Sequence, residues 1–194
     1  MDPRIQQMDD RLLLLNLYLT QAIALVLGFL GLYFFYLRQG VSFTSLFSLG
    51  ENGYSTLGWA LLLAALIIVI EVCLVYSLPA TYFDDGGINK KLFSNRTVGH
   101  IIVMTAIVAF CEELLFRLVL QDQIGLFWTS VIFAFVHIRY ISKWVMFTTV
   151  FLVSLSFGWL YIYTGSVIAP MVSHFVVDLI LALFIRFDLL KDKK

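Results

Sequence analysis

The amino-acid sequence predicts an all-α membrane protein, with about six transmembrane helices in a single domain that covers residues 1–194. Three observations support this prediction: hydrophobic residues fill 61% of the 194 positions, charged residues fill only 13%, and the mean hydropathy is +0.93. In ordinary soluble domains about a quarter of the residues are charged. A folded chain this short also keeps much of its surface in contact with the solvent. We therefore expect that solvent to be a lipid bilayer, which excludes a water-soluble enzyme, a disordered protein and a disulfide scaffold.

The transmembrane helices are predicted from apolar runs, because about 20 apolar residues are needed to cross a bilayer. Six runs occur, of which the fourth is short. The predicted spans are Leu12–Leu37, Leu57–Leu78, Val98–Leu120, Leu126–Ile138, Trp144–Tyr163 and Ser166–Phe187. The longest polar connector, Ala80–Thr97, contains an Asp-Asp-Gly-Gly turn signal and is predicted to be a loop.

The basic residues indicate how these spans are oriented. With six spans, 11 of the 13 Lys and Arg residues fall on one side of the membrane, and only Arg38 falls on the other. Cytoplasmic loops carry such an excess, so we expect a multi-pass membrane protein with both termini in the cytoplasm. No small-residue cleavage site follows the first apolar run, so we expect that run to be retained. The formal net charge of zero gives no indication of a nucleic-acid partner.

Several ionisable side chains lie inside the predicted spans. An Asp, Lys or Arg at the centre of a membrane helix costs about 2.5–3.5 kcal/mol, so such groups are functional candidates. The candidates are Glu71, Glu112, Glu113, Arg117, His137, His174 and Asp178. Glu71 has no partner at helical spacing, so a structural role and a role in a substrate groove remain equally open for it.

The spacing of the other six candidate residues indicates which of them can interact. Glu113 and Arg117 are four residues apart and can pair on one helix face, while Glu112 points toward a different neighbour. His174 and Asp178 are also four residues apart. Counted from the span ends at 1.5 Å per residue, Glu112, His137 and His174 all lie about 12–17 Å deep. A carboxylate and two imidazoles at one depth suit general-base hydrolysis of an amide with stabilisation of an oxyanion.

Three motifs carry a family resemblance: EExxxR at residues 112–117, FxxxH at residues 133–137 and HxxxD at residues 174–178. In this order, each on its own predicted span within the core 98–187, they resemble the signature motifs of the CPBP family. This family comprises the CAAX proteases and bacteriocin-processing proteins, also called Abi proteins. They are intramembrane endopeptidases related to the prenyl-protein protease Rce1. The resemblance covers about a third of the chain.

The resemblance implies a role for each motif residue. Glu112 would activate the hydrolytic water together with His137, Glu113 and Arg117 would maintain the geometry of the site, and His174 with Asp178 would form the oxyanion side. Two departures stand out. Leu118 follows the motif Arg where many members have Gly, and Asp178 replaces the Asn of the prenyl-protease branch. Because an ionised Asp cannot donate to an oxyanion, we expect Asp178 to orient His174 or to coordinate another group.

The predicted function is hydrolysis of a peptide bond in a membrane-associated protein or a peptide precursor, which includes lipidated substrates. No cofactor is expected. A zinc-dependent version is the less favoured enzyme alternative, because no HExxH motif is present and the ligands would come from separate helices. A non-catalytic role in bacteriocin self-immunity or membrane regulation is an alternative from another class. A proton-coupled transporter is a third, although no repeat relates the two halves of the chain.

Overall fold

The structure, a computed structural model, describes residues 9–50 and 52–190 and confirms the all-α prediction, since these residues form helices and connecting turns without a β-strand. The α-helices are α2 (Asp10–Phe35), α3 (Phe43–Leu46), α4 (Gly53–Ser77), α5 (Ile88–Phe93), α6 (Val98–Glu113), α7 (Asp122–Val136), α8 (Trp144–Thr164) and α9 (Ile168–Arg186). Short 3₁₀ segments occupy η1 (Leu37–Gln39), η2 (Ala80–Tyr82) and η4 (Ile138–Tyr140), and a π-helical segment occupies η3 (Leu114–Gln121).

Each predicted span corresponds to a helical passage. Within the described residues, four helical stretches are long and apolar enough to cross a membrane: α2 extended through η1, α4, α8 and α9. The third passage is α6, which continues directly into η3. The fourth is the shorter α7. This helix is kinked near its start at Gly125, whose φ of 81° and ψ of 167° are not helical. The expected loop at 80–97 differs from the structure, since it contains helix α5.

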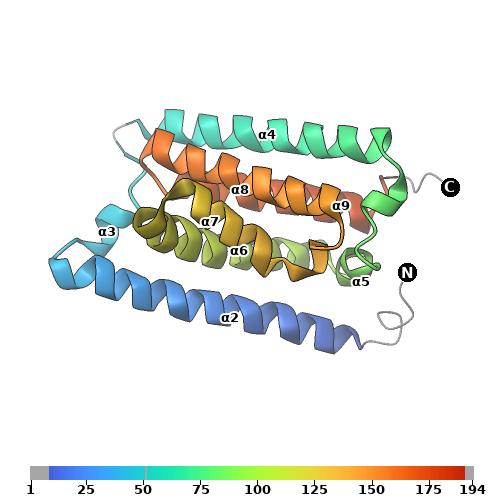
Figure 1. Ribbon diagram of the computed structural model, residues 1–194, viewed down its shortest axis with the longest axis horizontal. Coiled ribbons are helices and arrows are strands. Elements are labelled where there is room, and N and C mark those ends of the chain that lie inside the picture. The colour runs from blue at the N-terminus through green and yellow to red at the C-terminus, as the bar shows by residue number, and fades with distance from the viewer. Residues whose placement is uncertain (1–8, 51, 191–194) are drawn as a thin grey trace.

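The helices run alongside one another in a bundle. Figure 1 shows α2 along one side, α4 along the opposite side and α6 to α9 between them. Helix α9 packs against both α4 and α6, α7 packs against α8, and α2 packs against η3. The outward face of α4 consists of exposed apolar side chains, among them Leu61, Leu62, Leu66 and Val69, as expected for a surface in contact with lipid.

Two glycines allow α2 to approach η3 closely. A Cβ atom at Gly28 would lie 1.9 Å from Cδ2 of Leu114, and a Cβ at Gly31 would lie 2.3 Å from Cγ1 of Val119. Small residues at helix interfaces permit such close contact of membrane helices. This approach brings α2 onto the segment that carries the EExxxR motif.

The start of α2 and the end of α9 lie at the same end of the bundle (Figure 1). There Asp10 lies 3.7 Å from both Lys91 and Arg96, and Arg186 Nε donates to the carbonyl oxygen of Arg96 at 2.7 Å. An even number of passes brings the two ends of a bundle to one side, as predicted. The assignment of that side to the cytoplasm remains a prediction.

Candidate active site

The EExxxR motif lies where α6 changes into a π-helix. Glu112 and Glu113 are the last two residues of α6, and Arg117 lies in η3. Short π-helical stretches are rare and occur frequently at functional sites. Despite this change of helix geometry, the predicted pairing of Glu113 with Arg117 is confirmed, with Arg117 Nε donating to Glu113 Oε2 at 2.8 Å.

Glu113 is fully buried and both of its carboxylate oxygens are occupied. Arg117 holds Oε2, and Nδ1 of His174 lies 2.8 Å from Oε1. A buried carboxylate is stable only when it is paired and hydrogen-bonded. The first and third motifs therefore meet through Glu113, which joins α6 to α9.

Arg117 is also fully buried, and helix α8 supplies part of its environment. Its Nη2 donates to Ser154 Oγ at 3.0 Å, and its Nη1 donates to Gln121 Oε1 at 3.3 Å. Gln121 Nε2 in turn donates to the carbonyl oxygen of Gly158 at 2.9 Å. The sequence did not predict a role for Ser154, Gln121 or Gly158, because none of them is charged and none belongs to a motif. The one indication in the sequence that this helix face contacts the site was that Ser154 and Gly158 lie four residues apart on an apolar span.

His174 is buried between two carboxylates. Its Nε2 lies 3.4 Å from Asp178 Oδ2, on the side of the ring opposite to Glu113. The ring of Phe157 stacks on His174 with the centroids 5.1 Å apart. Asp178 is partly exposed and lies where an orienting partner of His174 is expected. Glu113, Asp178 and the ring of Phe157 together therefore orient the imidazole of His174.

Glu112 differs from Glu113 in both burial and partners. It is partly buried, and its Oε1 accepts one hydrogen bond of 3.0 Å from Nε2 of Gln21 on α2. Asn16 and Gln21 are the two amide side chains within the predicted first span, and such side chains often hydrogen-bond between membrane helices. Gln21 does so, whereas Asn16 lies on the exposed face of α2.

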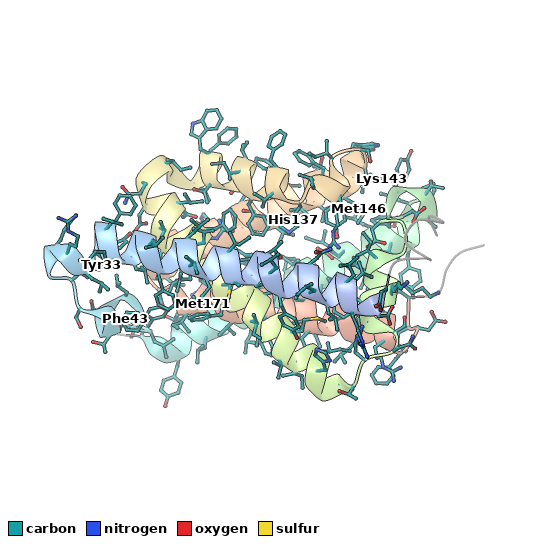
Figure 2. All side chains as sticks on the ribbon, turned by 90° about the horizontal axis from the view of Figure 1, so that it is seen from below. Tyr33, Phe43, His137, Lys143, Met146 and Met171 are labelled. Atoms are coloured by element: carbon teal, nitrogen blue, oxygen red, sulfur yellow. The ribbon has the colours of Figure 1, made fainter. Side chains whose placement is uncertain are left out.

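His137 directly follows the last residue of α7 instead of lying within the helix. Its Nδ1 is 2.7 Å from the carbonyl oxygen of Phe133. Because a carbonyl can only accept, Nδ1 carries the proton in this bond and the neutral ring keeps a lone pair on Nε2. Figure 2 shows His137 within the length of the bundle, farther from its end than Lys143. Within the described residues, no hydrogen bond or salt bridge joins His137 to Glu112.

Phe133 connects the three motifs by packing. Its ring lies 4.7 Å from the ring of His137 and 6.4 Å from that of His174, measured between centroids, and the guanidinium carbon of Arg117 lies 5.6 Å from its centroid. The ring is buried. Phe133 therefore packs against the site.

The six predicted site residues fall into two groups in the structure. Glu113, Arg117, His174 and Asp178 form one chain of direct contacts, and Glu112 and His137 flank it with separate partners. Among the residues that the structure describes, no three His, Cys, Asp or Glu side chains gather as ligands of a metal ion. Metal dependence itself stays a prediction.

Comparison with known proteins identifies the family. A family model described as type II CAAX prenyl endopeptidase Rce1-like matches residues 94–180, which contain all three motifs. An uncharacterized protein of Bacillus subtilis (strain 168), YpbD, is 44% identical over 132 residues, which are 68% of this chain and 70% of that protein. No solved structure matches the chain. Three motifs that converge on one buried site, inside the matched region of an all-α membrane protein, lead to one conclusion: the chain belongs to the Rce1-like family of CAAX-type intramembrane proteases.

Proposed function

We propose that this protein is a glutamate-dependent intramembrane endopeptidase that hydrolyses a peptide bond in a membrane-associated protein or peptide, lipidated substrates included. The proposal rests on membership of a protease family and on one geometric observation. The two adjacent glutamates are in different states: Glu113 is buried with both oxygens paired, and Glu112 is partly exposed with a single neutral hydrogen-bond donor.

This difference assigns the glutamates to different roles. A carboxylate that is already paired with Arg117 and His174 is a poor proton acceptor, because taking up a proton would break a buried ion pair. Glu112 has an oxygen left for a water molecule. We therefore assign the general base to Glu112 and a supporting role to Glu113. General-base catalysis by a positioned carboxylate contributes about 10²–10⁴-fold to a rate.

In the proposed reaction, Glu112 takes a proton from water while the water oxygen bonds to the carbonyl carbon of the scissile amide. Nε2 of His137 has a lone pair and accepts a hydrogen bond from the same water, which orients it. The carbonyl oxygen becomes an oxyanion. Protonated Glu112 then transfers its proton to the amide nitrogen as the carbon–nitrogen bond breaks and the carbonyl re-forms, which leaves a carboxylic acid and an amine.

The oxyanion requires a donor, and His174 fits this requirement. Glu113 accepts from Nδ1, so a proton on Nε2 is directed away from Glu113. The contact of Nε2 with Asp178 is long, at 3.4 Å, and leaves room for a competing acceptor. A donor that is already oriented before the reaction stabilises the oxyanion without reorganisation. Asp178 would keep the ring in position and would not itself donate.

The decisive experiment compares new protein termini in the membranes of cells that express the wild type or the Glu112→Gln variant at equal levels. We expect a defined set of termini to be lost in Glu112→Gln and in His137→Ala. Asp84→Asn is a matched control, because it also changes a carboxylate to an amide but lies in an exposed turn, where it accepts from the Gly86 amide. Identical termini in wild type and Glu112→Gln would overturn the proposal.

The same cells also test the non-catalytic alternative. If Glu112→Gln and His137→Ala both retain the biological effect of the protein at normal expression, the protein acts as a scaffold or immunity factor. Location in a bacterial plasma membrane with cytoplasmic termini is part of the proposal. It is tested by protease accessibility of tags at either end of the chain in intact cells.

A further inference from the structure

Glu71 lies in a mostly apolar groove outside the motifs. A cavity of about 530 Å³ lies between α4 and α8, which are neighbours in Figure 1. Glu71 is the one ionisable side chain in its lining, among the apolar side chains of Ile67, Ile70, Leu74, Leu152, Val153 and Trp159.

Among the residues that the structure describes, Glu71 has no cationic partner. These residues form no hydrogen bond or salt bridge with it, and Asp178, a second acid, is its one electrostatic neighbour among them. A charged side chain at membrane depth is costly unless it pairs with another group. Two neighbouring acids make this worse, because like charges disfavour ionisation. A positive charge in the groove would compensate both acids in their ionised form.

The groove lies close to the reaction centre. Asp178, which interacts electrostatically with Glu71, also lies 3.4 Å from Nε2 of His174, the proposed oxyanion donor. Two side chains, Ile67 and Phe157, connect the lining of the groove to His174. Ile67 lines the groove and packs with Phe157, which in turn stacks on His174.

We propose that this groove binds the substrate segment beside the scissile bond and that Glu71 pairs with a Lys or Arg side chain of that segment. The inference rests on the proposed protease function and deepens it by naming a substrate class. Lys and Arg combine a long apolar stem with a charged end. The stem suits the apolar lining and the charge suits Glu71.

The experiment uses purified full-length protein in liposomes. The substrate is a pool of peptides prepared by cleavage after Glu, which leaves internal Lys and Arg intact, and mass spectrometry maps the new termini. For the wild type we expect enrichment of Lys or Arg at one fixed position relative to the cut. Glu71→Gln should lower cleavage of these basic peptides at least about tenfold, since the ion pair is lost. Cleavage of the other peptides should stay unchanged.

Charge reversal provides a second test. Glu71→Lys should shift the enriched residue from Lys or Arg to Asp or Glu. Asp84→Lys is the matched control, because Asp84 is an acid in an exposed turn outside the groove and its charge reversal should leave the preference unchanged. Thermal unfolding of each variant shows whether it is folded.

The inference is wrong if Glu71→Gln cuts the same peptides with the same preference, or if it slows all peptides equally. This failure differs from failure of the proposed function. If Glu112→Gln abolishes every cut while Glu71→Gln changes no preference, only the substrate class is refuted. If Glu112→Gln removes none of the cuts, the protease mechanism itself is refuted.

Discussion

Nδ1 of His174 lies 2.8 Å from Oε1 of Glu113, a residue 61 positions earlier in the chain, and this contact joins the first and third motifs. It belongs to a series of contacts in which nitrogen-bearing side chains alternate with carboxylates: Arg117, Glu113, His174 and Asp178. Each member is positioned by its neighbours, so the orientation of the imidazole depends on residues that do not contact it.

The Glu113–Arg117 pair should be energetically coupled. Glu113→Gln leaves a fully buried guanidinium without its carboxylate, and we expect a loss of about 3–5 kcal/mol in the free energy of unfolding. The double variant Glu113→Gln/Arg117→Met should be less destabilised than the sum of the single variants. Unfolding in detergent of the wild type and three variants measures the coupling. Strictly additive losses would contradict the structure.

Gly158 should tolerate no larger side chain. A Cβ there would lie 2.4 Å from both Gln121 Oε1 and Leu126 Cδ1. Gly158→Ala should therefore cost about 1–3 kcal/mol of stability through overpacking. The matched control is Gly58→Ala on α4, where a Cβ meets nothing within 4 Å. That variant should be neutral or stabilised, because Ala favours helix over Gly. Equal melting temperatures for the two variants would refute the proposed close contact.

Gln21 should influence catalysis from outside the motifs. Its amide holds one oxygen of Glu112, and a hydrogen bond to a charged group contributes about 1.5–3 kcal/mol. Gln21→Leu should reduce the initial cleavage rate of a mapped substrate about tenfold or more. Asn16→Leu, on the exposed face of the same helix, should keep the wild-type rate. If both variants are equally active, Gln21 does not position the base.

Removal of metal ions should leave the activity intact. The proposed mechanism uses Glu112, His137 and His174 without a metal, so protein dialysed against EDTA and 1,10-phenanthroline should cleave at the untreated rate. Activity that falls in chelator and returns when zinc is added would favour the zinc-dependent alternative. Untreated protein carried through dialysis without chelator is the control for simple inactivation.

Local features of the site were predictable from the sequence. Side chains four residues apart on a helix share a face, which was enough to predict the pairing of Glu113 with Arg117 and the proximity of His174 to Asp178. Helix α5 was missed, since its six residues are flanked by turn signals that favour a loop. The position of His137 just after α7 was also not foreseen, because periodicity locates helix ends only within a few residues.

Hydropathy and helical periodicity act within one segment of chain, so the lipid environment, the fold class and the motifs were predictable without any tertiary contact. Three features follow only from the packing of the helices: the contact of Glu113 with His174, the hydrogen bonds of Ser154 and Gln121 with Arg117, and the place of Glu71 in the lining of a groove between α4 and α8. These contacts depend on how α4, α6, α8 and α9 pack, and that packing is set by side-chain shape along whole helices. Residues distant in sequence become neighbours only once those surfaces fit together.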